Sequence, residues 1–217
     1  PYTIRLFIPN GDPNNFKIIS KMNWTGVGLE VSRNSWGTYK ERPEINSAGV
    51  YILVGYDEDQ DLPKIYIGQG DGVRPRIDSH EKSKSFWDRA IIFVSSNVGL
   101  NRAHITWLEW ALITQAQRAN RCILDNAATP NEPVLTESEK ADTNEFFSEI
   151  LSVLPLLELK VFEEAKKIES SHDNSAINKK SSIQDVIVVP AQEEGFRDVF
   201  LGENCWYAVR IGGGKLK

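Results

Sequence analysis

The chain has 217 residues, of which 41% are hydrophobic and six are tryptophan, and its formal net charge is −5. This composition excludes an intrinsically disordered chain and is typical of one medium-sized globular domain with a buried core. No apolar run approaches the roughly 18 residues that a membrane span needs, so we expect no membrane partner.

The cysteines and the charge distribution exclude further classes of protein. Only Cys122 and Cys205 occur, which predicts neither a disulfide framework nor a cysteine-based zinc site and favours a cytoplasmic location. Residues 1–131 hold 15 Lys and Arg against 14 Asp and Glu, a net of +1, whereas residues 132–170 hold 4 against 10, a net of −6. The first part is therefore nearly neutral, but it lacks the broad basic face of a nonspecific nucleic-acid binder.

The first 47 residues are expected to form an extension that packs on the core. Residues 3–8 alternate in polarity before Pro9 and are predicted to form a strand. Residues 16–22 are predicted to form a short helix. Residues 24–36 mix glycine, β-branched and aromatic residues, which indicates an irregular strand and loop.

The central part, residues 48–165, alternates strand and helix patterns. Strands are predicted at residues 49–55 and 64–68, around an acidic turn, and a third at residues 90–95. A short helix should begin near Pro75, where proline suits the first helical position, and end near residue 81. Two longer helices follow: Asn101 is the expected N-cap of a helix that ends near residue 119, and an amphipathic helix covers residues 136–154.

The end of the chain changes in composition. Residues 166–182 are rich in Lys, Ser, Asn and Asp and are predicted to be a flexible linker. Residues 183–189, 192–199 and 205–211 are predicted as strand, helix and strand. We expect residues 183–217 to be a tail or the truncated start of a further module.

Tyr51 and Tyr66 lie on the two strands that flank the acidic turn. In an antiparallel hairpin centred near residues 58 and 59 they would be directly opposed, about 5 Å apart at Cβ. Two adjacent phenols suit proton transfer. The alternative is that tyrosine is simply a good strand former.

Arg76 and His80 are four residues apart and share one face of the predicted short helix. A guanidinium pairs with phosphate oxygens and an imidazole can move a proton, so the pair suits phosphate chemistry. A solvated helix face is the alternative, and spacing alone does not separate Arg76 from Arg74.

Glu109 falls within the apolar stripe of the long helix. A carboxylate there is costly unless it is bound to a metal ion or paired, for example with an arginine, and both alternatives stay open. Asn126, which follows this helix, is by default a turn residue.

The order and spacing of these residues resemble the GIY-YIG nuclease family. The likeness covers about residues 48–130 and comprises Gly-Val-Tyr at 49–51, Tyr-Ile-Gly at 66–68, an arginine ten residues past the second tyrosine, and a glutamate in a helix after the third strand. His80 and Asn126 also match members of that family. Val50 in place of isoleucine and Pro75 before the arginine depart from the pattern without removing a functional group.

The resemblance implies an α/β fold with a small three-stranded antiparallel sheet flanked by helices. It implies hydrolysis of DNA phosphodiester bonds with Mg²⁺ (or Mn²⁺) bound by Glu109. It further implies that Tyr51 or Tyr66 acts as general base, that Arg76 stabilises the transition state, and that Asn126 holds a tyrosine or a phosphate. Phenols ordinarily titrate near about 10, so a phenol base needs positive charge nearby, which Arg76, His80 and the ion would supply.

Two classes of function therefore compete. The first is an active endonuclease, with target choice supplied by a further C-terminal domain or a protein partner. The second is a nucleic-acid-binding or interaction module that keeps the fold without cleaving. The full set of site residues favours the enzyme, and the acidic net charge favours the binding module.

Overall fold

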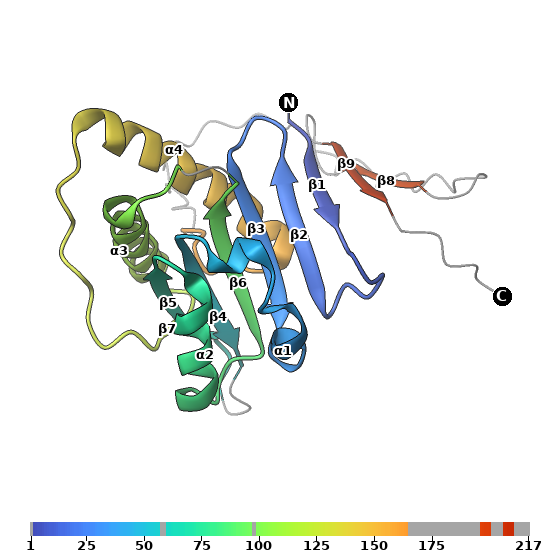
Figure 1. The fold of residues 1–217 in the computed structure, drawn as a ribbon, viewed down its shortest axis with the longest axis horizontal. Helices are drawn as coiled ribbons and strands as arrows, with labels where there is room; N and C mark the ends of the chain where they lie inside the picture. Colours follow the sequence, from blue (N-terminus) through green and yellow to red (C-terminus); the bar gives the residue numbers. More distant parts are fainter. Residues whose placement is uncertain (1, 57–59, 97–98, 165–195, 201–205, 211–217) are drawn as a thin grey trace, which may run out of the picture.

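The computed structural model describes residues 2–56, 60–96 and 99–164, together with two strands at residues 196–200 and 206–210. Within these residues one mixed sheet has the strand order β1-β2-β3-β6-β4-β5-β7 (Figure 1). Its strands are β1 (Ile4–Phe7), β2 (Phe16–Lys21), β3 (Gly26–Ser32), β4 (Gly49–Gly55), β5 (Lys64–Gly70), β6 (Arg89–Ser95) and β7 (Ile123–Leu124). The helices are α1 (Trp36–Tyr39), α2 (Val73–Ser83), α3 (Arg102–Ala119) and α4 (Glu137–Val153), with 3-10 turns η1 (Arg33–Ser35), η2 (Pro43–Asn46) and η3 (Leu154–Leu157).

Helices cover both faces of the sheet (Figure 1). On one face α3 and α4 pack against alternate strand residues such as Ile52 and Ile67. On the other face, α1 and α2 pack against the residues between them, including Tyr51 and Leu53. Because successive strand side chains point to opposite faces, each central strand contributes to both cores.

The α/β class is confirmed, but the expected three-stranded sheet is wrong in extent. Strands β4, β5 and β6 do form an antiparallel set, with β4 between the other two. The second edge of β6 pairs along its whole length with β3, and β2 and β1 continue the sheet outward. The extension at residues 1–47 therefore joins the central sheet through backbone hydrogen bonds as well as packing on it.

One local prediction in that extension is wrong, and another is right only in part. Residues 16–22 are not a helix, because Phe16–Lys21 pairs with a strand on each side and places Phe16 and Ile19 in opposite cores. Residues 24–36 are more regular than expected, since Gly26–Ser32 is a strand in register with β6. Pairing with neighbouring strands, and for Gly26–Ser32 also with the distant strand β6, overrides the weak local preference.

The helices lie close to their predicted bounds. Asn101 caps α3, and its side chain accepts a hydrogen bond from the backbone N–H of His104. Thr136 and Glu139 form a capping box at the start of α4. Helix α2 starts two residues earlier than expected, so Pro75 lies within the first turn, where its missing N–H has no intrahelical partner to lose.

In the tail, β8 (Phe196–Phe200) and β9 (Trp206–Arg210) form an antiparallel hairpin. The strand predicted at residues 205–211 is confirmed. The helix predicted at residues 192–199 is wrong over residues 196–199, which belong to β8. The predicted linker at residues 166–182 and the strand at residues 183–189 lie outside the described part of the chain.

One edge of the sheet is short of backbone partners. Strand β7 has two residues and pairs in parallel with Lys64 and Ile65 at the start of β5. Beyond Ile65, no further strand residue pairs with this edge of β5 among the described residues. From Tyr66 onward, β5 therefore has no neighbouring strand on this side among the described residues.

Candidate active site

The two tyrosines share one face of the β4–β5 hairpin but are not directly opposed. Tyr51 pairs with Gly68, and Tyr66 pairs with Leu53, so the predicted register is wrong by two residues. A shift of two keeps both side chains on the same face, because side chains alternate with a period of two. The rings are diagonal neighbours with centroids 6.3 Å apart.

This register explains the glycine of Tyr-Ile-Gly. The Tyr51 ring lies across Gly68, and a Cβ atom built at Gly68 would overlap the Tyr51 hydroxyl and ring. Glycine is therefore required by close approach of a side chain to the backbone, whatever its conformational freedom.

His80 of α2 contacts both tyrosines. Its Nε2 atom lies 2.9 Å from the Tyr51 hydroxyl, and its ring meets that of Tyr66 edge-on with centroids 4.6 Å apart. Burial, assisted by the charges of Lys84 and Arg76, lowers the pKa of His80 to about 4. The imidazole is therefore neutral near pH 7, and in the tautomer with an unprotonated Nε2 it accepts a hydrogen bond from the Tyr51 hydroxyl.

Arg76 lies one turn before His80 and is the cation nearest the Tyr51 phenol. Its pKa is raised, first by interaction with Tyr51 and further by Tyr66 and Glu109. No carboxylate of the described residues lies within ion-pair distance of Arg76, whereas Arg74 pairs with Glu41 and Asp78. The structure thus separates the two arginines that spacing left ambiguous.

Tyr51 itself is fully buried and resists ionisation. Burial, and next the neighbouring Tyr66, raise the pKa of Tyr51, against the opposing effect of Arg76. The phenol is neutral at physiological pH, so it can take a proton only as it passes its own proton on.

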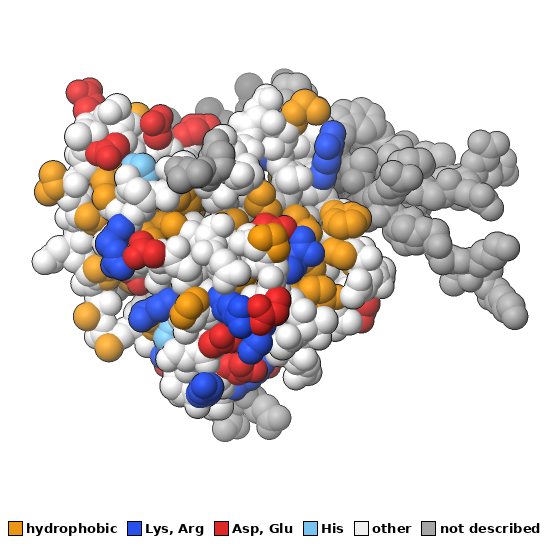
Figure 2. Space-filling model, viewed as in Figure 1, with side chains coloured by type: hydrophobic (Ala, Val, Ile, Leu, Met, Phe, Trp, Pro, Cys, Tyr) orange, Lys and Arg blue, Asp and Glu red, His pale blue; other side chains and the backbone are white. Residues whose placement is uncertain are grey.

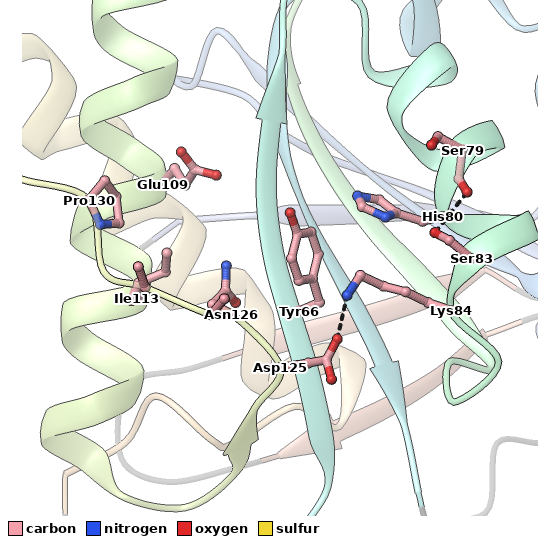
Figure 3. Close-up of a pocket in the computed structure, with 12 residues that line it drawn as sticks. Tyr66, Ser79, His80, Ser83, Lys84, Glu109, Ile113, Asp125, Asn126 and Pro130 are labelled. Carbon is pink, nitrogen blue, oxygen red and sulfur yellow. Dashed lines mark hydrogen bonds and ion pairs between the residues drawn. The ribbon is translucent and has the colours of Figure 1, made fainter.

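Glu109 projects from α3 across the cleft from α2 (Figure 3). It is half-buried, and burial raises the pKa of its carboxyl although Arg76 opposes the shift. None of the described side chains makes a hydrogen bond or an ion pair with this carboxylate. The described residues therefore do not form the buried Glu109–Arg ion pair that was the alternative.

Asn126 holds the open edge of β5. Its side-chain carbonyl accepts a hydrogen bond from the Ile67 N–H at 3.0 Å, and its amide donates to the Ile67 carbonyl at 2.8 Å. The side chain thereby takes the place of a strand residue beside Tyr66. Both polar atoms of the Asn126 side chain bond the Ile67 backbone, so Asn126 positions the strand that carries Tyr66, and among the described residues it makes no hydrogen bond to a phenol.

Lys84 and Asp125 belong to the site but did not emerge from the sequence. The Lys84 ammonium pairs with Asp125 and lies 4.3 Å from the centroid of the Tyr66 ring. Asp125 also pairs with Lys64 at 3.2 Å. Lys84 continues the four-residue spacing of Arg76 and His80, which is the signal that would have indicated it.

An open cleft of about 500 Å³ lies between α2 and α3 beside β5 (Figure 3). Four of the six predicted site residues line it: Tyr66, His80, Glu109 and Asn126. Tyr51 lies behind His80, with which it shares a hydrogen bond, and Arg76 interacts with both Tyr51 and Glu109. The six residues thus belong to one neighbourhood, built by β4, β5, α2, α3 and the segment after β7.

The donor set restricts which metal ion would fit. Among the described residues no group of three or more His, Cys, Asp or Glu side chains could enclose an ion. One half-buried carboxylate without a hydrogen-bonding partner remains, at Glu109. Such a site fits Mg²⁺, which commonly takes one or two carboxylates and completes its shell with water and substrate phosphate.

Comparisons with known proteins place no relative beside this chain: no family model, no curated protein and no solved structure matches it. Within the described residues, no helix has the length and apolarity needed to cross a membrane. What the fold and site define is an α/β protein with a tyrosine, histidine and glutamate cleft at a sheet edge.

Proposed function

We propose that this protein is a divalent-metal-dependent endonuclease of the GIY-YIG type that hydrolyses DNA phosphodiester bonds. The observation that carries the proposal is the convergence of Tyr51, Tyr66 and His80 with a free half-buried carboxylate, Glu109, on the opposite side of one cleft. A fold that merely binds nucleic acid gains nothing from a half-buried anion facing its ligand.

Charge in the cleft supports a phosphate ligand with a cation. Lys84 and Lys64 share the carboxylate of Asp125, whereas Arg76 and Glu109 have no ion-pair partner among the described residues. Arg76 suits the oxygens of a phosphate because guanidinium donors match them in a fixed fork. Glu109 would repel the same phosphate, and a divalent ion bound there would reverse that repulsion.

The phenol and imidazole define a route for the proton. In the step we propose, a water oxygen forms a bond to phosphorus and the bond to the leaving oxygen breaks. The water proton passes to the oxygen of Tyr66, which lines the cleft, while the Tyr66 hydroxyl proton passes to the neutral imidazole of His80, so no free phenolate forms. Tyr51, behind His80, holds the imidazole in place through its hydroxyl, and the leaving oxygen takes a proton from solvent.

Glu109 would hold Mg²⁺ or Mn²⁺, which supplies charge to stabilise the pentacovalent phosphate. Arg76 acts on the same developing charge from α2. Asn126 keeps β5, and with it Tyr66, in register through the Ile67 backbone.

A non-cleaving binding module is the second candidate, and one observation favours it. On the face in Figure 2, Lys and Arg side chains are interspersed with Asp and Glu and form no continuous basic stripe. Several basic side chains near the cleft are also in ion pairs, including Lys64, Lys84 and Arg102. DNA affinity would then depend on the ion, a partner or the residues after 165.

We place the protein in the cytoplasm on its low cysteine content.

The deciding experiment is nicking of a supercoiled plasmid in Mg²⁺, in Mn²⁺ and in EDTA. We expect cleavage with either ion and none in EDTA. Glu109→Gln keeps the side-chain volume and removes the charge, so it should lower the rate by at least about a hundredfold, the scale of losing one electrostatic catalytic group.

Glu145→Gln is the matched control, because Glu145 is exposed on α4 and lies outside the cleft. It should cleave at the wild-type rate. Wild-type cleavage by Glu109→Gln would contradict the metal assignment, and a wild-type protein that binds but never nicks would identify the binding module.

A further inference from the structure

The cleft has two chemically unlike walls. The wall from α2 is polar and carries the hydroxyls and charges of Ser79, His80 and Lys84. The opposite wall, from α3 and the segment after Asn126, carries the Glu109 carboxylate and beside it the apolar side chains of Ile113, Ala128 and Pro130 (Figure 3). Tyr66 stands between them. A ligand that fills both halves needs one anionic, hydrogen-bonding end and one flat or apolar part.

The apolar wall is held in place before any ligand arrives. Asn126 fixes its start through the two hydrogen bonds to Ile67. The Gln117 amide of α3 donates to the Thr129 hydroxyl at 2.7 Å, which ties the middle of the segment to the helix. Ala127 and Ala128 are exposed. Because their methyl side chains are small, the recess beside them stays open.

The volume of the cleft exceeds what a backbone phosphate requires. About 500 Å³ lies within the range of about 300–1,000 Å³ that pockets for whole small molecules have. In a continuous duplex the base faces are stacked on their neighbours, so only sugar and phosphate reach a concave site. A nucleotide outside the stack presents a phosphate and an apolar base together.

Resting on the proposed nuclease function, the geometry points to an unpaired nucleotide as the occupant of this cleft. Its phosphate faces α2 and its base lies against the wall formed by residues 127–130. The substrate class is accordingly a strand with a single-stranded segment, such as a flap or tail, in preference to a continuous duplex. The base contacts are apolar and therefore carry no base identity.

The test compares two fluorescein-labelled DNA hairpins of the same stem sequence, one blunt and one with a short single-stranded tail. Binding is followed by fluorescence anisotropy in Ca²⁺, at one fixed salt concentration. We expect the tailed hairpin to bind at least about tenfold more tightly, because the blunt one must first unstack a base. Equal affinity of the wild-type protein for the two hairpins overturns the inference.

Ala128→Gln places a larger polar side chain in the recess, and Val134→Gln makes a similar change on the same connection at a position that is 97% exposed and outside the cleft. Ala128→Gln should bind the tailed and the blunt hairpin with about equal affinity, because the tailed hairpin loses affinity while the blunt one binds as it does to the wild-type protein. Val134→Gln should keep the preference. A full preference in Ala128→Gln places the base elsewhere and overturns the inference.

Cleavage of both hairpins in Mg²⁺ is measured separately. A tail preference in binding without any cleavage supports this inference and contradicts the proposed nuclease. Cleavage of both hairpins with no preference in binding supports the nuclease and overturns the unpaired-nucleotide site.

Discussion

His80 lies between two phenols, where its imidazole stays neutral. Burial and two neighbouring cations, Lys84 and Arg76, oppose its protonation, and only Asp125 favours it. A histidine that is already protonated cannot accept a proton from a neighbouring phenol. The surroundings of His80 therefore suit the acceptor role that the proposed route requires.

The lowered pKa of His80 makes a prediction about pH and stability. In the unfolded chain this imidazole binds a proton below its ordinary pKa of about 6.5, whereas in the folded protein it does so only below about 4. The unfolded state thus binds more protons in this interval, and the free energy of unfolding should fall as the pH falls from about 6.5 towards 4.

Urea unfolding at neutral pH and near pH 5 measures this effect. His80→Asn should lose part of the decrease that the wild-type protein shows, even though it also loses the Tyr51 hydrogen bond. His104→Asn, at the start of α3, controls for the general effect of removing an imidazole. An unchanged decrease in His80→Asn would mean that His80 is not held neutral by the fold.

Gly68 leads to a second prediction for a single residue. In Gly68→Ala the new methyl group meets the Tyr51 ring and must push it away from His80. Overpacking of this kind typically lowers the free energy of unfolding by about 1–3 kcal/mol. The nicking rate should also fall, even where the variant remains folded, because the Tyr51 phenol moves away from His80.

Gly37→Ala is the control for that substitution, since a Cβ at Gly37 in α1 meets no atom within 4 Å. Alanine is the better helix former, so Gly37→Ala should be neutral or stabilise by up to about 1 kcal/mol. Thermal unfolding of both variants decides the matter. A Gly68→Ala protein with wild-type stability and activity would show that Tyr51 can move freely.

Strand β5 depends on a side chain to complete its outer edge. Strand β7 ends at Leu124, and the Asn126 amide supplies the next pair of hydrogen bonds, to Ile67. The neighbouring Asp125 also ties this edge to Lys84 at the end of α2. The elements that carry Tyr66 and His80 are thereby joined at residues after α3, far away in the chain.

Asn126→Ala should expose this dependence. It leaves the Ile67 N–H and carbonyl without partners, at a typical cost of about 1–3 kcal/mol. Amide hydrogen exchange at Ile67 should speed up more than exchange in β4. Asn144→Ala, at an exposed position of α4, is the control and should change neither. Unchanged protection of Ile67 would mean that solvent replaces the side chain at no cost.

Across the whole molecule, the described core closes after α4. Residues 154–162 carry five apolar side chains that are at most 5% exposed: Leu154, Leu157, Leu159, Val161 and Phe162. The Gln115 side chain donates to the Phe162 carbonyl at 2.9 Å and fixes this segment on α3. These residues belong to the fold, although they follow its last long helix.

Truncation tests where the folding unit ends. A chain cut after residue 164 loses the contacts between β9 and the edge strand β1 but keeps every residue of the two described core clusters, so we expect it to fold and to retain nicking. A chain cut after residue 153 loses five buried side chains at about 1.5–3 kcal/mol each, which is comparable with the whole stability of a domain, about 5–15 kcal/mol. It should not fold, as circular dichroism would show, and failure of the longer fragment would make residues after 164 integral to the domain.

Much of the secondary structure and the identity of the site residues follow from the sequence by itself. The Asn101–His104 and Thr136–Glu139 caps join residues three apart, so the local sequence determines where α3 and α4 begin. The β-branched runs of β4 and β6 likewise predict strands wherever they pack. The phenols, guanidinium, imidazole and carboxylate are visible as residue types at defined spacing.

Tertiary structure alone decided how those residues meet. The hairpin register that sets Tyr51 across Gly68, the partner of Asn126 and the pairing of Lys84 all join residues distant in the chain; Asn126 is 59 positions from Ile67, and Lys84 is 41 from Asp125. Residues 16–21 became a strand because two neighbouring strands offered hydrogen bonds that no local pattern contains. Local hydrogen bonds such as helix caps join residues that are close in the sequence, so the sequence pattern predicts them. Sheet partners and cleft walls depend instead on packing between distant residues, which only the folded chain brings together.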